Sequence, residues 1–231
     1  MNTDFFKFEK GDRDFPFYNA NPKISQGDWI ILLFSMILAF GVYLFYPNGL
    51  ISAILFPVIM LIPLLYYLKG DIGALFTRLS ANDLALVVIL FVGYLIYAII
   101  LGEILANIGL MGNEAADNGF ISWFSTFTLI FSLMGEELLK LIPFLLFLRI
   151  FFKYTHSRKF SMIFSMLVVM LGFGLLHATD LSAIPSVILI QGLGSIFEFL
   201  AYFRSKNLLM SYLTHLLTDV FIFVVTLVGV I

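Results

Sequence analysis

The sequence predicts an all-α fold, a polytopic bundle of about seven transmembrane helices, from three observations. Of the 231 residues, 61% are hydrophobic and only 12% are charged, whereas soluble domains average about 45–50% apolar and about 25% charged residues. Apolar stretches of roughly 20 residues, the length that crosses a bilayer as a helix, recur along the chain. Lys and Arg gather at every second connection between these stretches, which is typical of a chain threaded repeatedly through a membrane.

The first part of the chain, 1–28, is expected to be a cytoplasmic or interfacial segment before a single transmembrane domain, 29–231. It mixes four cationic residues with several aromatic ones, a composition suited to the headgroup boundary of a bilayer. A disordered tail is the alternative interpretation. The segment contains no apolar stretch of the kind found in a cleavable signal peptide.

The first three predicted spans are 29–46, 50–68 and 84–101. A Pro-Asn-Gly turn separates the first two, and these residues punctuate helices. Two prolines interrupt the second span, where neighbouring helices can accommodate them. The polar connection before the third span has apolar residues at helical spacing, which predicts a short interfacial helix there.

The fourth predicted span, 120–152, is longer than a crossing needs, so we expect it to be tilted, or broken near Pro143. An acidic loop, 102–119, precedes it and a basic loop, 153–159, follows it. The remaining predicted spans are 160–178, 183–203 and 208–231.

The distribution of cationic residues also predicts the orientation of the bundle. The chain has 13 Lys and Arg residues. All of them except Lys140 lie in the N-terminal segment or at or near alternate connections, and the other connections hold none. Cytoplasmic loops carry the excess of Lys and Arg in membrane proteins. The N-terminus is therefore predicted to be cytoplasmic.

Composition excludes several classes of function. The formal net charge of -2 gives no reason to expect a nucleic acid partner. The absence of cysteine excludes disulfides, thiolate metal sites and cysteine nucleophiles. The zinc motif HExxH is absent, so no cofactor is predicted. A metal site stays open only if two His and two Glu side chains converge.

The fourth span carries the strongest functional signal, because Glu136, Glu137 and Lys140 lie within an apolar stretch. A charged side chain at the centre of a bilayer costs about 2.5–3.5 kcal/mol on insertion scales. A structural ion pair between Glu136 and Lys140, four residues apart on a helix, is one interpretation. It leaves Glu137 unexplained, and intramembrane ionisable groups are usually functional.

Four more ionisable residues fall within or near the predicted spans: His177, Glu198, His215 and Asp219. His215 and Asp219 are four residues apart, so they share one helix face and can hydrogen-bond. A carboxylate that accepts from one ring nitrogen fixes the tautomer and leaves the other nitrogen free to act. Glu198 has three possible settings: a pair with Arg204, a pair with Gln191, or the wall of a shared chamber.

Together these residues could activate a water molecule. A glutamate in an apolar, partly hydrated chamber can take a proton from water and return it to a leaving amine. The two histidines can orient that glutamate or donate to the oxyanion of a tetrahedral intermediate. Lys140 can hold one glutamate ionised and thus divide the pair into different roles. A serine nucleophile within 192–195 is a weaker alternative, since small residues on helices usually serve close packing.

Three motifs in chain order resemble the CPBP family, the glutamic intramembrane proteases related to type II CAAX prenyl endopeptidases and bacteriocin-immunity proteins. Glu136-Glu137 resembles the paired-glutamate motif of the family. Phe173 to His177 fits its Phe-x-x-x-His motif. The segment 211–219, which ends in His-x-x-x-Asp, resembles its final His-x-x-x-Asn/Asp helix.

The chain departs from the family pattern at two places. The family usually has Arg five residues after the first glutamate, where this chain has Leu141. The cation is Lys140 instead, and this Glu-Glu-x-x-Lys arrangement resembles the PrsW-type proteases of the same clan. Those proteases generally carry an acidic residue at the position of His177.

The resemblance implies an intramembrane endopeptidase with its catalytic core at about 120–220, in the cell membrane of a prokaryote. Its substrate would be a membrane-embedded or lipidated peptide or protein. Glu136 would activate water with support from Glu137 and His177, while His215 and Asp219 would form the oxyanion side. The predicted site residues are Glu136, Glu137, His177, His215 and Asp219, supported by Lys140, Phe173 and Glu198.

Two other functions remain open on the sequence. One is a non-catalytic membrane scaffold or bacteriocin-immunity-type protein, in which the charged cluster holds helices together. The other is a proton-coupled carrier that uses Glu136, His177 and Glu198 as a relay.

Overall fold

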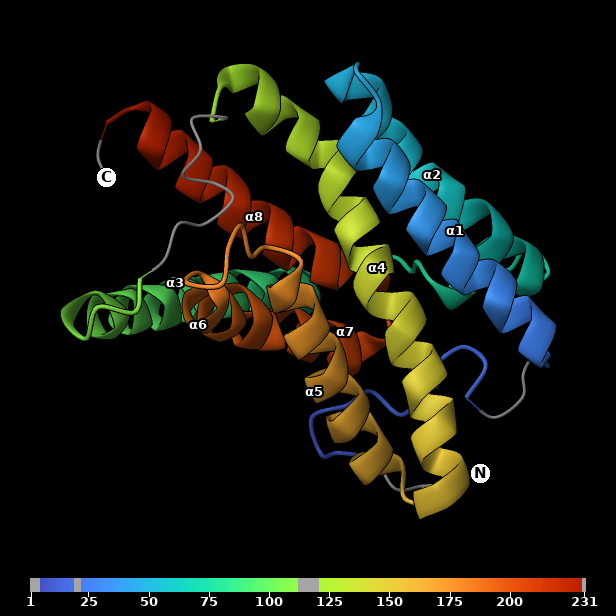
Figure 1. Cartoon of the computed structure of the whole chain (residues 1–231). Helices are drawn as coiled ribbons and strands as arrows, with labels where there is room; N and C mark the ends of the chain where they lie inside the picture. Colours follow the sequence, from blue (N-terminus) through green and yellow to red (C-terminus); the bar gives the residue numbers. More distant parts are fainter. Residues whose placement is uncertain (1–4, 19–21, 112–120, 230–231) are drawn as a thin grey trace.

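The structure, a computed structural model, describes residues 5–18, 22–111 and 121–229, and their fold is all-α (Figure 1). The elements in chain order are α1 (Gln26–Phe45), α2 (Gly49–Tyr67), the 3-10 turn η1 (Ile72–Ala74), α3 (Ala81–Asn107), α4 (Trp123–Thr155), α5 (Arg158–Leu175), α6 (Ile184–Val187), the π-helical turn η3 (Ile188–Gly192), α7 (Ile196–Ser205) and α8 (Leu208–Leu227).

Six helical segments are long and apolar enough to cross a membrane, which indicates an integral membrane protein. They are α1, α2, α3, α5, the continuous segment Ile184–Ser205 that joins α6 to α7, and α8. The seventh long helix, α4, has 33 residues but carries the charged residues Glu136, Glu137 and Lys140 in its middle. The seven predicted helical segments are therefore present, and six of them have an apolar window long enough to cross a membrane. The orientation of the bundle stays a prediction.

Polar caps explain why three helices begin where they do. Ser25 and Ser80 accept hydrogen bonds from the backbone of Asp28 and Asp83, and each aspartate bonds back to the cap. Such capping boxes satisfy the free N–H groups of a first helical turn. Ser122 forms a similar cap for α4. The sequence placed the starts of α1 and α3 three residues late, because an apolar stretch does not include the polar first turn.

α4 lies at the centre of the bundle and packs against α2, α5 and α8 (Figure 1). Its contact with α2 is close at Gly135, where an added Cβ would lie 2.2 Å from the Phe56 ring. α5 and η3 also approach closely: a Cβ on Gly174 would lie 2.9 Å from the carbonyl oxygen of Val187. Small residues permit such contacts between membrane helices.

The small residues at 192–195 have the same packing role. Ser195 is buried, and its hydroxyl donates a 2.7 Å hydrogen bond to the carbonyl of Gly192 in the π-helical turn. This back-bonding satisfies the hydroxyl within its own helix. The geometry therefore favours close packing over the serine-nucleophile alternative.

The N-terminal segment crosses one end of the bundle (Figure 1). Phe15, Phe17 and Tyr18 are buried, and the Phe15 ring packs on Phe144 of α4 and Tyr202 of α7. The segment is thus part of the packed structure and not a detached tail. It lies at the same end of the bundle as the end of α4, the start of α5 and the end of α7, which carry several cationic residues.

A buried ion-pair network fastens this segment to the bundle. Both oxygens of Glu9 accept 2.7 Å hydrogen bonds from Arg158 at the start of α5. Lys206, in the turn between α7 and α8, lies 3.0 Å from Glu9, and Asp14 also contacts Arg158. The basic loop predicted at 153–159 is wrong, because α4 continues to Thr155 and Arg158 is completely buried in α5. Composition alone cannot distinguish a buried, paired arginine from a loop arginine.

The Glu9 network predicts a specific pH dependence of stability. Burial raises the pKa of Glu9, but hydrogen bonds from Arg158 and from the Phe6 backbone outweigh it, so the pKa lies below its ordinary value of 4.5. A lowered pKa in the folded state stabilises the fold above the ordinary pKa, and this contribution is lost as the pH falls through the folded value. We expect Glu9→Gln to lower the unfolding temperature at about pH 7, and the deficit to narrow below about pH 4.

The measurement is thermal unfolding of the purified protein in detergent across this pH range, with Glu103→Gln on the exposed face of α3 as the matched control. If the unfolding temperature of Glu9→Gln were lower than that of the parent by the same amount at every pH, the lowered pKa of Glu9 would be contradicted.

Candidate functional site

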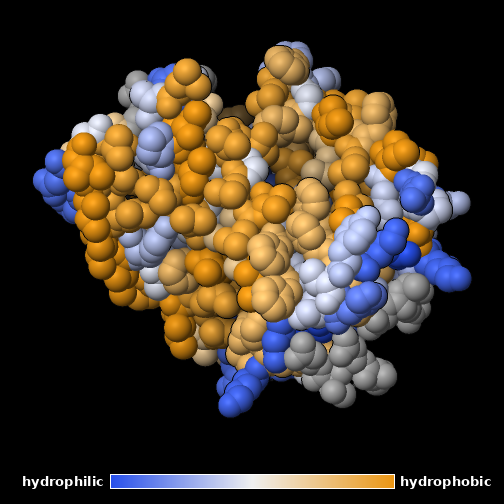
Figure 2. All heavy atoms as spheres, turned by 60° about the horizontal axis from the view of Figure 1, so that its bottom comes forward, coloured by the Kyte–Doolittle hydropathy of each residue, from blue (hydrophilic) through white to orange (hydrophobic). Residues whose placement is uncertain are grey.

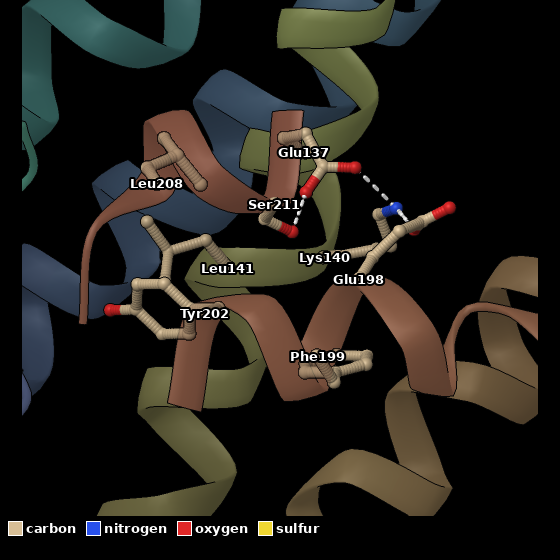
Figure 3. Close-up of a pocket in the computed structure, with 8 residues that line it drawn as sticks. All are labelled: Glu137, Lys140, Leu141, Glu198, Phe199, Tyr202, Leu208 and Ser211. Carbon is tan, nitrogen blue, oxygen red and sulfur yellow. Dashed lines mark hydrogen bonds and ion pairs between the residues drawn. The ribbon is translucent and has the colours of Figure 1, made fainter. Parts of the chain in front are cut away.

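Four of the predicted residues meet in the buried interior, on three different helices. Lys140 of α4 forms ion pairs with Glu137, at 2.5 Å, and with Glu198 of α7. Its ammonium nitrogen also lies 3.5 Å from Nδ1 of His215 on α8. Figure 3 shows the ammonium group between the two carboxylates. All four residues are buried, so the charges compensate one another within the protein.

Glu137 has partners on both of its oxygens. Oε1 lies 2.5 Å from the Lys140 ammonium and 2.8 Å from Nδ1 of His215, while Oε2 accepts a hydrogen bond from the Ser211 hydroxyl. Only 2% of its side chain is exposed. Glu137 is therefore a satisfied structural acceptor, and it fixes one nitrogen of the His215 ring.

Glu198 has a partner that was not among the settings considered from the sequence. It pairs with Lys140 across the interface between α4 and α7. Arg204, one of the expected partners, donates instead to the Phe8 carbonyl at 2.8 Å. The spacing within α7 suggested local partners, whereas the true partner comes from a helix 58 residues away in sequence.

Glu136 lies on the other side of His215 from Glu137. Nε2 of His215 is 3.9 Å from Glu136 and 3.6 Å from Asp219. These separations exceed direct hydrogen bonding, so the predicted same-face pair of His215 and Asp219 is close but not bonded. The side chains of Glu136 and Asp219 are 19% and 28% exposed. The ion pair considered between Glu136 and Lys140 does not occur among the described residues, because Lys140 pairs with Glu137 and Glu198.

Phe173 and His177 bring α5 to the same group. The Phe173 ring packs edge-on against both imidazoles, with centroids 4.7 Å from His177 and 6.2 Å from His215, and the Lys140 ammonium lies 4.6 Å from its centroid. His177 follows the end of α5, and its Nδ1 lies 2.9 Å from the Phe173 carbonyl. Because a carbonyl accepts, Nδ1 carries the proton and Nε2 is left as the free position of the neutral ring.

His177 sits at the edge of the group. It interacts electrostatically with Asp219, and no hydrogen bond joins it to Glu136 in the part of the chain that the structure describes. The structure thus gathers the predicted residues around His215, with His177 outermost.

The cavity at this site is small and lies beside the buried cluster of Glu137, Lys140 and Glu198. Its volume is about 10 Å³, and it is bordered by Glu137, Lys140 and Glu198, by Ser211, and by apolar residues that include Tyr202 (Figure 3). A cavity needs about 10–15 Å³ to hold one water molecule. This cavity therefore has room for about one water molecule, and Glu136 does not border it.

Glu137, Glu198 and His215 are the described residues best placed to hold a metal ion, since their ligand atoms lie within 4.8 Å of one another. Two carboxylates and one imidazole are donors that suit zinc. The ammonium of Lys140 contacts the same three residues. It already supplies the positive charge that this donor set requires, so a metal ion would have to displace it.

Ser211 is a contact of this cluster that the sequence did not single out. Its hydroxyl completes the hydrogen bonding of Glu137. The available signal was its position four residues before His215, which places both side chains on one face of α8.

In comparisons with known proteins, no family model, no curated protein and no solved structure matches the chain.

The buried cluster predicts a large and coupled effect of removing Lys140. Lys140→Met leaves the carboxylates of Glu137 and Glu198 without their cation, and breaking a buried ion pair in this way costs about 3–5 kcal/mol of unfolding free energy. Lys140→Met/Glu198→Gln removes one of the stranded charges, so we expect it to be more stable than Lys140→Met.

Chemical denaturation in detergent micelles measures these free energies. The control is Lys7→Met at an exposed position, where we expect a change within about 0.5 kcal/mol. A loss for Lys140→Met as small as that of the control would show that the cluster does not stabilise the fold.

Proposed function

We propose that the protein is an intramembrane endopeptidase in which Glu136 activates water. The observation that carries this proposal is the division of the glutamate pair by His215. Glu137 is saturated by Lys140, His215 and Ser211, whereas Glu136 is partly exposed and 3.9 Å from the imidazole. Two adjacent carboxylates in different surroundings support different roles in acid–base chemistry.

The separation of Glu136 from His215 is too long for a direct hydrogen bond, and a water molecule can bridge groups at such separations. In the proposed reaction, Glu136 accepts a proton from water while the water oxygen attacks the carbonyl carbon of a peptide bond. The protonated Glu136 then gives that proton to the leaving amine, which breaks the carbon–nitrogen bond. Water is the only co-reactant.

His215 is placed to stabilise the tetrahedral intermediate. Nδ1 lies 2.8 Å from Glu137. Nε2 lies 3.6 Å from Asp219 and 3.9 Å from both Glu136 and Glu198. When both ring nitrogens carry protons, Nδ1 donates to Glu137 and Nε2 can donate to the oxyanion. Asp219 supplies a negative charge beside the imidazolium. In this account Lys140 and Glu198 hold the catalytic helices in place, and Phe173 orients the two imidazoles.

The setting of the proposed reaction follows from the six long apolar helices and the resemblance to the CPBP family. A site within a membrane bundle suits a membrane-embedded or lipidated peptide substrate. The alternating Lys and Arg residues favour a cytoplasmic N-terminus, and the resemblance favours the cell membrane of a prokaryote.

A non-catalytic scaffold of the bacteriocin-immunity type is the second candidate. The observation that favours it is the buried cluster in which Lys140 pairs with both Glu137 and Glu198 and so joins α4 to α7. Such a cluster would stabilise the bundle whether or not any reaction occurs.

The two candidates differ in the effect of Glu136→Gln. General acid–base catalysis typically contributes about 10²–10⁴-fold to a rate, so we expect this variant to lose at least about a hundredfold of cleavage while its unfolding temperature stays near that of the parent. The measurement is mass spectrometry of a mixed set of prenylated and unprenylated membrane peptides, incubated with the purified protein in liposomes.

The matched control is Glu103→Gln on α3, which should cleave like the parent. Equal cleavage by Glu136→Gln and the parent would exclude Glu136 as the base. No cleavage of any peptide by the parent would favour the scaffold.

A further inference from the structure

A groove separates the beginning of α1 from the end of α4, at a distance from the polar cluster. Its volume is about 930 Å³, and ligand pockets commonly measure about 300–1,000 Å³. Trp29, Ile30 and Leu33 of α1 form one wall, and Leu146 and Ile150 of α4 are part of the other. Both helix ends belong to the end of the bundle that the N-terminal segment crosses (Figure 1).

The groove changes character along its length. The walls formed by Ile30, Leu33 and Leu146 are aliphatic, whereas Arg149, Lys153 and Tyr154 belong to the last two turns of α4. Figure 2 brings this end forward and shows hydrophilic residues at the border of a largely hydrophobic surface. An apolar channel with a polar mouth matches the shape of a lipid, in which an acyl chain continues into a headgroup.

The charges at the mouth are of one sign. Arg149 and Lys153 line the groove, and none of its described lining residues is acidic. Within the described ranges neither residue forms an ion pair: Arg149 donates to the Phe17 carbonyl at 3.2 Å, and Lys153 lies over the Tyr154 ring. The guanidinium of Arg149 has five N–H donors, so this one bond leaves donors for a ligand. By contrast, Glu9 pairs with the cations Arg158 and Lys206 in the buried network.

We propose that this groove binds an anionic phospholipid, with Arg149 and Lys153 at the phosphate and the acyl chain along Ile30, Leu33 and Leu146. Basic pockets between helices at a membrane surface suit anionic headgroups. Tyr154 is exposed at the mouth of the groove, and such aromatic residues prefer the headgroup level, while the buried Trp29 forms part of the wall. The lipid site is separate from Glu136 and does not depend on hydrolysis by this protein.

The chain offers a built-in reporter for this site. It contains two tryptophans, of which Trp29 lines the groove and Trp123 begins α4 at the opposite end of that helix. In a Trp123→Phe background the remaining fluorescence comes from Trp29. A bromine-labelled acyl chain in the groove quenches this fluorescence by contact.

The experiment compares brominated phosphatidylglycerol with brominated phosphatidylcholine in nanodiscs that hold the full chain. Each cation at a membrane surface contributes about 1 kcal/mol of attraction for anionic lipid, or about fivefold in affinity. We expect quenching to reach its half-maximum at a mole fraction of phosphatidylglycerol at least about fivefold lower than that of phosphatidylcholine. Water-soluble glycerol phosphate should not displace the lipid, because it lacks the acyl chain.

The preference should disappear in Arg149→Gln/Lys153→Gln and persist in Lys69→Gln/Arg78→Gln, which removes two exposed charges from the connection between α2 and α3. The emission spectrum of Trp29 without brominated lipid verifies that each variant is folded. Equal half-maxima for the two lipids in the parent would overturn the proposal. So would a preference that Arg149→Gln/Lys153→Gln retains, or one that Lys69→Gln/Arg78→Gln also loses.

Discussion

The contact of the Lys140 ammonium with Glu137, Glu198 and His215 is the interaction on which the arrangement of this bundle depends. A buried charge is costly unless good geometry and additional hydrogen bonds compensate it. Here the charged groups that compensate one another come from three helices, α4, α7 and α8. The cluster therefore restricts how these helices can rotate against one another. Glu136, the residue before Glu137 on α4, lies near the other nitrogen of the His215 ring.

A second polar layer closes the bundle at one end. Glu9 holds Arg158 and Lys206, and Phe15 packs on Phe144 and Tyr202. Tyr202 in turn borders the small cavity beside Lys140. The N-terminal segment is thus linked through an aromatic layer to the charged cluster. The partly exposed side chains of Glu136 and Asp219 lie near Nε2 of His215, so we expect water to reach the site there.

Apolar length was enough to predict the seven helical segments, and helical spacing was enough to place His215 near Asp219. The same spacing suggested an ion pair between Glu136 and Lys140, which is wrong, because Lys140 pairs with Glu137 and Glu198. Helix starts were misplaced where polar caps such as Ser25 and Ser80 lie outside the apolar stretch. The partners of Glu198 and Arg158 could not be predicted, because they depend on which helices pack together. For the same reason the sequence suggested one shared hydrated chamber, whereas the cavity beside Lys140 is bordered by Glu137 and Glu198 and not by Glu136. The start of the fourth predicted span, at 120, lies outside the described residues.

The most direct test of this account is whether water reaches position 136. The chain has no cysteine, so Glu136→Cys gives a single thiol, and Leu138→Cys gives a matched thiol at a fully buried position of the same helix. The measurement is the rate of labelling by a hydrophilic maleimide in liposomes, with gel filtration to verify folding. The account predicts labelling at 136 and protection at 138. Equal protection of both thiols would place Glu136 in dry packing and contradict its role as a base.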